Sequence, residues 1–175
     1  IKVLVQGVAD TAVLTTEENA VFIENNADAT APQILVGGFG SVPLNQVITD
    51  AASPDNDGSE SLTLRVTNLN SEFAISGASF IGGTDTDRVW LISPAQLADA
   101  KVLLPINFSG TVTADVVAIT TENDGDSQSN ASEVISFTVT PSIDETIKTS
   151  TNNLQEDTLG KVDFSLLVPT AEVGD

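Results

Sequence analysis

The sequence predicts an all-β fold in which antiparallel strands pack as a sandwich, and three observations support this prediction. Short runs alternate apolar and polar residues, as in Leu62-Thr63-Leu64-Arg65-Val66, where every second side chain is aliphatic. Residues typical of turns, namely Gly, Asn, Asp and Ser, separate these runs. Apolar residues make up 41% of the chain and aromatic residues only 5%, so Val, Ile, Leu and Ala must supply the core, and that mixture favours strands.

The expected strands are short and follow one another with turn-rich stretches between them. This spacing is typical of an antiparallel sandwich rather than of a parallel sheet with crossover helices. Each strand is a run in which apolar residues recur at every second position. In chain order the runs are Lys2 to Val5, Leu62 to Val66, Phe73 to Ile75, Val89 to Ile92, Val102 to Leu104, Val112 to Ile119 and Val134 to Val139.

One stretch, Ser93 to Ala100, has helical character. Ser93 precedes a proline that would occupy the first helical position, which is a common way for a helix to begin. The stretch is long enough only for a short helix. The chain then returns to extended structure, and we expect Pro105 to end the next strand or to lie at a sheet edge.

The composition excludes several classes of function. The chain has no cysteine and no histidine, which removes disulfides, thiolate nucleophiles, sulfur-based zinc sites and imidazole bases. With 25 acidic and 6 basic residues the formal net charge is -19, so nucleic acid is not an expected partner. Repulsion among these carboxylates opposes compaction unless cations neutralise them, and Ca²⁺ prefers clustered oxygen ligands. The alternative is a solvated, salt-tolerant acidic surface.

Neither a membrane-spanning helix nor a signal peptide is expected from the sequence. No apolar run approaches the roughly 20 residues that a transmembrane helix needs. The first residues lack the charged region, apolar stretch and small-residue cleavage site of a signal peptide. Because the chain also lacks an initiator Met, we expect it to be a piece of a longer protein.

An internal repeat suggests how the chain is organised. Ile1 to Thr11 resembles Phe137 to Glu145, since each is a strand-like run that ends in a short acidic linker. We therefore expect residues 1–10 to be the last strand of a preceding repeat, residues 11–141 to be a complete β-sandwich repeat, and residues 142–175 to be a linker with the opening of the next repeat. The alternative is that both terminal segments complete a single folded unit.

The strongest candidate for a metal site is the stretch Asp50 to Glu60. It places four carboxylates in eleven positions directly before an alternating strand. Gly58 permits a tight backbone conformation that lets neighbouring oxygens converge, and calcium takes six to eight such oxygens in flexible geometry. The ligand spacing of an EF-hand is absent. The alternative is an acidic turn exposed to solvent.

Several motifs in this order resemble the cadherin-like repeats of giant RTX adhesins, which Gram-negative bacteria secrete through type I systems. The motifs are Asp57-Gly58-Ser59-Glu60-Ser61-Leu62, Val89-Trp90-Leu91-Ile92-Ser93-Pro94-Ala95-Gln96-Leu97 and Asn107-Phe108-Ser109-Gly110. A fourth, Leu154-Gln155-Glu156-Asp157-Thr158, resembles the acidic opening segment of such a repeat. The resemblance implies immunoglobulin-like sandwiches chained end to end, with calcium between them, on the outside of the cell.

The resemblance also implies where the calcium ligands lie. Asp10 and Asp144 occupy the linker position; Glu17 or Glu18, and Glu156 with Asp157, occupy the opening position; Asp55, Asp57 and Glu60 form the acidic loop. Two features depart from the family pattern. The first opening segment reads Glu17-Glu18-Asn19 where Glu-Asp-Thr is usual, and the stretch Ala20 to Gly40 is longer than typical.

A second acidic cluster, Glu122-Asn123-Asp124-Gly125-Asp126, connects two strongly predicted strands. It is either a plain hairpin turn or a further calcium loop in which Glu122, Asp124 and Asp126 are ligands. The stretch Gly82 to Asp87 is similar but is expected to be a plain exposed hairpin. Trp90, the only tryptophan, is expected to anchor the core rather than to stack on a ligand.

These observations favour a non-enzymatic function: a calcium-rigidified spacer of a long adhesin that projects a distal binding region, in cell adhesion or biofilm formation. Its partners would be the neighbouring repeats of the same chain, and an isolated piece would be monomeric. One alternative is a module that itself binds sugar, peptide or ice. Another is a filament subunit that assembles by strand exchange. Hydrolysis by paired carboxylates is disfavoured because the acids lie in turn-like stretches without aromatic platforms.

Overall fold

A computed structural model of the chain describes residues 6–23, 40–55, 57–84, 88–105, 108–125 and 127–141. Strands take up 58% of these residues and helices 6%, which confirms the predicted all-β class. The helices within the described ranges are too short to cross a lipid bilayer.

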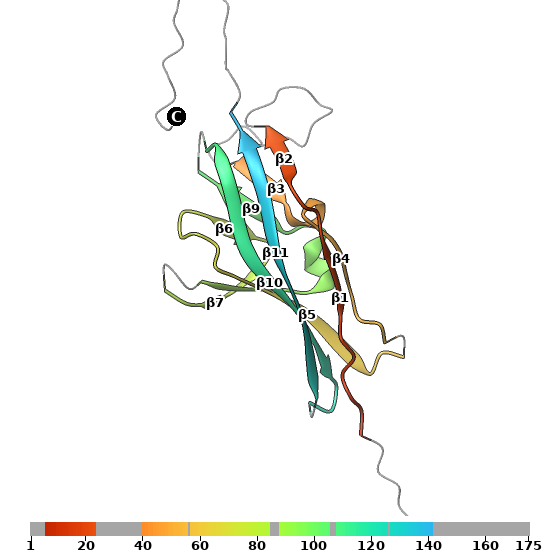
Figure 1. Ribbon diagram of the computed structural model, residues 1–175. Coiled ribbons are helices and arrows are strands. Elements are labelled where there is room, and N and C mark those ends of the chain that lie inside the picture. The colour runs from red at the N-terminus through yellow and green to blue at the C-terminus, as the bar shows by residue number, and fades with distance from the viewer. Residues whose placement is uncertain are drawn as a thin grey trace, which may run out of the picture.

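Eleven strands and two short helical elements make up the described part of the chain (Figure 1). The strands are β1 (Val13–Thr16), β2 (Ala20–Ile23), β3 (Gly40–Pro43), β4 (Ile48–Ala52), β5 (Glu60–Thr67), β6 (Ala74–Ser76), β7 (Ser79–Gly82), β8 (Val89–Ile92), β9 (Lys101–Leu104), β10 (Gly110–Glu122) and β11 (Gln128–Thr140). The helical elements are the 3₁₀ turn η1 (Leu44–Gln46) and the helix α1 (Pro94–Leu97).

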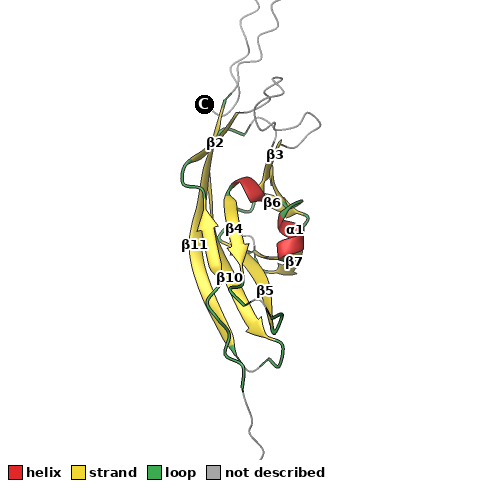
Figure 2. Cartoon of the chain, turned by 90° about the vertical axis from the view of Figure 1, so that its right-hand side faces the viewer, coloured by secondary structure: helices red, strands yellow, loops and turns green. Residues whose placement is uncertain are grey.

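The strands form three sheets that pack in two layers. One layer is a six-stranded sheet in the order β2-β11-β10-β5-β8-β7, and Figure 2 shows it from the side. The facing layer holds the three-stranded sheet β3-β9-β6 and the pair β1-β4. All pairings are antiparallel except that of β2 with β11, which is parallel. The arrangement is the β-sandwich that the alternating runs predict.

The core lies between the two layers and follows from the period-two alternation of the strands. Along β10 every second side chain, from Val112 onward, is buried, while the intervening side chains are exposed or half-buried. Leu64 and Val66 of β5 and Ile135 and Phe137 of β11 point into the same cluster. Burial of these side chains in one cluster is the main force that holds the sheets together.

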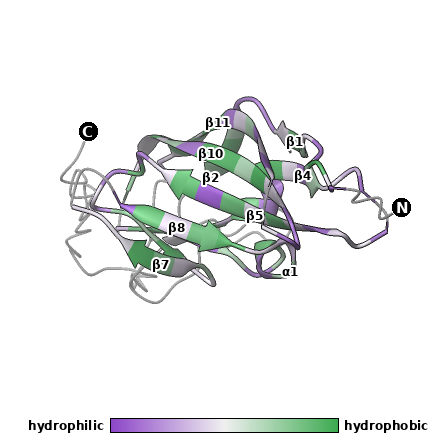
Figure 3. Ribbon diagram, turned by 90° about the horizontal axis from the view of Figure 1, so that it is seen from below, coloured by the Kyte–Doolittle hydropathy of each residue, from purple (hydrophilic) through white to green (hydrophobic). Residues whose placement is uncertain are grey.

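Trp90 is part of this core, as predicted. It is 9% exposed and packs against Phe80 across the β7–β8 pair, with ring centroids 4.8 Å apart. Figure 3 shows hydrophobic stretches on both of these strands. No described group accepts a hydrogen bond from the buried indole Nε1. Phe80 lies at the free edge of the sheet and is 52% exposed.

The predicted short helix is α1, and Ser93 caps it. The Ser93 hydroxyl accepts a hydrogen bond from the Gln96 N–H at 3.3 Å, and the Gln96 side chain accepts one from the Ser93 N–H at 2.9 Å. This reciprocal pair is a capping box, which satisfies two backbone donors that a helix start leaves free. The proline at the first turn needs no such partner. The strand that follows, β9, ends directly before Pro105, as predicted.

Replacing the cap should weaken the fold by a modest amount. We expect Ser93→Ala to lower the free energy of unfolding by about 1 kcal/mol, because the Gln96 N–H keeps only the Ser93 carbonyl as an acceptor and the Gln96 side chain loses the Ser93 hydroxyl. Ser132→Ala, on the exposed part of β11, is the matched control and should stay within about 0.5 kcal/mol of the parent. Urea denaturation of the three proteins measures both values. Equal effects of the two substitutions would contradict the capping role.

The described chain begins and ends at opposite ends of the elongated sandwich. Residues 6–12 run along the end where β10 turns into β11, and Thr140 closes β11 at the other end, beside β2 (Figure 1). Residues 6–10 lie against this sandwich, since the Ala9 N–H donates to the Ser127 hydroxyl at 3.0 Å. The repeat boundaries near residues 10 and 141 stay a prediction, and residues 1–5 and 142–175 lie outside the described residues.

Candidate functional site

Three acidic stretches gather at the end of the sandwich where the described chain begins, which we call the acidic end. The first is the N-terminal segment, residues 6–12. The second is the acidic loop, residues 53–60, which leads into β5. The third is the hairpin turn, residues 122–127, which joins β10 to β11 (Figure 1). The sequence predicted acids in each of these stretches, and the fold brings the stretches together.

Two glutamates lie on the inner face of the sheet at this end. Glu60 is the first residue of β5 and Glu122 the last of β10, and they stand directly opposite each other in the antiparallel ladder. Glu122 continues the inward alternation of β10, after Ala118 and Thr120. Like charges opposite each other in a sheet destabilise it, so this pair needs a compensating interaction.

Glu122 is buried, with 8% of its surface exposed. The N-terminal segment covers it: a Cβ added at Gly7 would lie 2.5 Å from the Glu122 Cδ, so any larger residue there would have to displace the Glu122 carboxylate. Burial raises the pKa of Glu122, and the negative charges of Glu60, Asp124, Asp55 and Asp57 raise that pKa further. The carboxylates of the acidic loop and of the hairpin turn therefore act on one another electrostatically.

The acidic loop is organised by its own side chains. The Asp55 carboxylate accepts hydrogen bonds from the Ser59 hydroxyl at 2.7 Å and from the Asp57 N–H at 3.1 Å. These bonds lower the pKa of Asp55, the serine hydroxyl contributing most. The Asp57 carboxylate accepts from the Ser59 N–H at 2.8 Å. The Ser53 hydroxyl donates to Glu60 Oε2 at 2.6 Å and so ties the loop to β5.

Hydrogen bonds also join the three stretches to one another. The Asn123 backbone N–H donates to the Ser59 carbonyl at 2.8 Å, and its side-chain amide donates to the Gly58 carbonyl at 2.9 Å. The Asp10 N–H donates to Glu60 Oε1 at 2.5 Å, while the Thr120 hydroxyl donates to the Asp10 carbonyl. A displacement of one stretch would therefore disturb its hydrogen bonds to the others.

The donor chemistry of the acidic end suits calcium, but the side chains do not converge. Carboxylate oxygens are the ligands that Ca²⁺ prefers in proteins. Among the residues that the structure describes, no three acidic side chains are grouped so that they would hold a metal ion. Binding would thus require Glu60, Glu122 and an aspartate of the acidic loop to turn toward one point.

The structure does not bring every predicted ligand to the acidic end. Glu17 and Glu18 are exposed in the turn between β1 and β2, next to Asn19, whose φ of 63° suits an asparagine in a tight turn. The Glu17 N–H donates to Val47, at the opposite end of the β1–β4 ladder from the acidic loop. The predicted ligands Asp126, Asp144, Glu156 and Asp157 lie outside the described residues.

Sequence reasoning missed the neutral residues that build the acidic end. They are Gly7, Ser53, Ser59, Thr120 and Asn123. For Glu122 a signal was available, because the alternation that begins at Val112 places Glu122 on the buried face if it is followed to the end of the strand. For Asn123 the sequence holds no such signal, since its role depends on a contact between distant loops. The bonds of Ser53 and Ser59 lie within the acidic loop itself.

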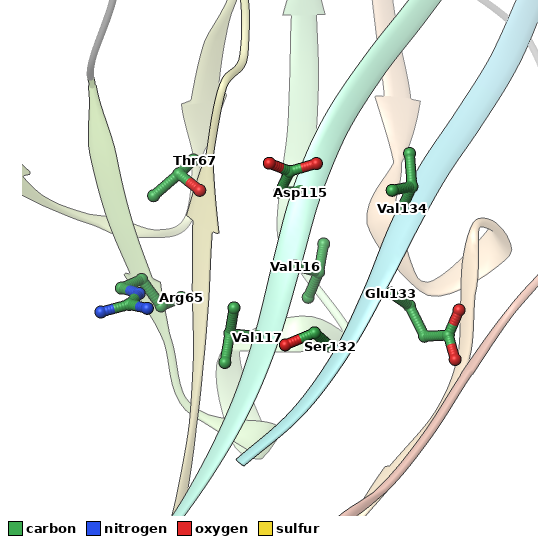
Figure 4. A pocket seen from close by; sticks show the side chains of 8 residues that line it. All are labelled: Arg65, Thr67, Asp115, Val116, Val117, Ser132, Glu133 and Val134. Carbon is green, nitrogen blue, oxygen red and sulfur yellow. The ribbon is translucent and has the colours of Figure 1, made fainter.

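A second feature is a shallow hollow of about 450 Å³ on the outer face of the six-stranded sheet. Arg65, Asp115 and Glu133 supply its charges, and Figure 4 shows their side chains pointing in different directions. Asp115 also accepts a hydrogen bond from the Asn68 side chain. A ligand site needs polar groups that converge, and this hollow does not provide them.

Comparison with known proteins finds no protein-family model, no curated protein and no solved structure that matches this chain.

Proposed function

We propose that this chain is a calcium-stiffened spacer repeat of a long cell-surface adhesin, located outside a Gram-negative cell and without catalytic activity. In this proposal each repeat is a rigid bead. Calcium at the junction neutralises facing carboxylates, so that successive beads cannot bend freely. A row of such beads projects a distal binding region away from the cell, in adhesion or biofilm formation.

The observation that carries the proposal is the facing pair of glutamates at the acidic end, of which Glu122 is buried and Glu60 half-buried. Glu122 is buried, stands opposite Glu60 and is covered by the N-terminal segment. An unpaired buried charge is costly, and a hard divalent cation would turn this repulsion into attraction. Glu60 and Glu122 would hold the ion together with Asp55 or Asp57 of the acidic loop.

The path of the chain also supports end-to-end assembly. The described chain begins at the acidic end and leaves from the opposite end (Figure 1). In a tandem array the exit of one sandwich would then stand next to the acidic end of the following one. An ion held between the N-terminal segment and the two loops would fix the direction in which the chain enters the sandwich.

The finer fold that we propose is immunoglobulin-like. The strand order β11-β10-β5 in one layer and β3-β9-β6 in the facing layer supports this proposal, because an immunoglobulin domain has two facing antiparallel sheets. The parallel pairing of the early strand β2 with the last strand β11 also supports this proposal. Trp90 departs from the usual pattern, because it lies on β8 rather than on β5.

Calorimetric titration with calcium tests the proposal. We expect the chain to bind calcium and Glu60→Gln to weaken that binding by tenfold or more, about 1.4 kcal/mol, because a charged ligand is lost. Glu133→Gln, an exposed acid on β11, removes the same charge away from the acidic end and should bind calcium like the parent. Equal loss of calcium binding in both variants would indicate general screening of the negative charge rather than a specific site.

Sedimentation tests the alternative of a filament. The chain should sediment as a monomer, since growth of the particles with concentration would favour assembly by strand exchange.

A further inference from the structure

The acidic loop and the hairpin turn each contain an Asp-Gly step, and the two steps differ in how the glycine nitrogen is held. The sequence has such steps at Asp57-Gly58 and at Asp124-Gly125, and nowhere else. Both glycines have positive φ and open space where a Cβ would lie, 81° at Gly58 and 78° at Gly125. In neither step, therefore, does a side chain on the glycine hinder approach to the peptide bond.

The hydrogen bonds distinguish the two steps. The Gly125 N–H donates to the Glu122 carbonyl at 2.8 Å, inside the hairpin turn. No described group accepts a hydrogen bond from the Gly58 N–H. The Asp57 carboxylate accepts a hydrogen bond from the Ser59 N–H at 2.8 Å, which turns that carboxyl group back toward the backbone that follows it. Asp57 and Gly58 are both exposed.

We infer that Asp57 is a site of spontaneous isomerisation to isoaspartate, and that Asp124 in the folded chain is protected. The Gly58 nitrogen attacks the Asp57 Cγ, and a C–N bond forms. The carboxyl group reacts in its protonated form: its OH leaves as water together with the amide proton, which closes a five-membered succinimide. Water then opens the ring at the backbone carbonyl, so that the chain continues through the former side chain. The product has the mass of the parent and no oxidant or cofactor takes part.

The conversion changes the acidic loop. It inserts one carbon into the backbone between Asp57 and Gly58 and shortens the carboxylate side chain by the same carbon. The hydrogen bond between the Asp57 carboxylate and the Ser59 N–H depends on the original lengths. We therefore expect the modified loop to lose this bond, so that the modification records the age of the protein and does not act as a switch.

The test is incubation of the purified chain in chelator at physiological pH and temperature, so that the result does not depend on the proposed calcium. Peptides containing each step are then examined by electron-transfer mass spectrometry, which distinguishes isoaspartate from aspartate. Most of the isoaspartate should be at residue 57, and Asp57→Glu should remove most of the total while Asp124→Glu leaves it. In denaturant, where the Gly125 bond is broken, both steps should convert at similar rates. Equal conversion of the two steps in the folded chain, or none at Asp57, would overturn the inference.

Discussion

Glu122→Gln should raise the unfolding temperature of the chain in chelator at neutral and higher pH. Glutamine has the shape of glutamate but no charge, so it removes the repulsion from Glu60, Asp124, Asp55 and Asp57 at a buried position. A substitution that removes a charged group from the core of a natural protein usually destabilises it when the group is paired. Here the expected sign is the opposite, because the neighbours of Glu122 are acids.

The gain from this substitution should depend on pH in a defined direction. Because the folded state raises the pKa of Glu122, the folded parent binds its proton more tightly than the unfolded chain does. The parent therefore becomes more stable as the pH falls through the folded pKa toward the unfolded value. The advantage of Glu122→Gln should be full above the folded pKa and should vanish below the unfolded one.

Calcium should reverse the order of the two proteins. If Glu122 is a ligand, saturating calcium stabilises the parent, by about 4 kcal/mol at a free concentration of 1,000 times Kd, and stabilises Glu122→Gln much less. Glu133→Gln is the control for a general reduction in charge and should follow the parent within about 0.5 kcal/mol in both conditions. If Glu122→Gln were more stable than the parent in calcium as well as in chelator, Glu122 would not be a ligand in the proposed site.

Phe22→Ala should lower the free energy of unfolding by about 3 to 5 kcal/mol, an effect typical of a large side chain in a core. Phe22 is 3% exposed and packs edge-to-face against Phe137, with ring centroids 5.5 Å apart. It lies on β2, a four-residue strand whose one partner among the described strands is β11. The unfolding temperature should fall by on the order of 10 °C.

The neighbouring residue supplies the control for this prediction. Val21 lies on the same strand and is 59% exposed, so Val21→Ala should cost no more than about 0.5 kcal/mol. Thermal and urea unfolding of both variants measure the difference. If Phe22→Ala and Val21→Ala had equally small effects, β2 would not belong to this folding unit, and the predicted repeat would have to begin after it.

The strands that could be predicted from the sequence are those with a clear alternation. Val112 to Ile119 and Val134 to Val139 lie inside the long strands β10 and β11, and Val89 to Ile92 is β8. The strands β1, β2, β3, β4 and β7 were not predicted. They have four or five residues and contain Gly, Pro, Ala or Thr. Their neighbours in the sheets hold them in extended form, so tertiary contacts rather than local patterns define them.

The acidic end could be predicted in part. Clusters of acids around Asp57 and Asp124 were visible in the sequence, and the fold places both at one end of the sandwich. The burial of Glu122 was not predicted, because that residue was assigned to the turn although it is the last inward residue of β10. The separation of Glu17 from this end was not predictable either, since it depends on how β1 pairs with β4.

Thermal unfolding in chelator, in millimolar calcium and in millimolar magnesium is the most direct test of the calcium-stiffened spacer. Specific oxygen ligands on flexible loops favour calcium, whereas magnesium demands a near-ideal octahedron and screens general charge equally well. The proposal predicts that calcium raises the unfolding temperature of the parent by on the order of 10 °C and that magnesium raises it far less. Equal and small increases with both ions would contradict it, and the acids would then be a solvated surface.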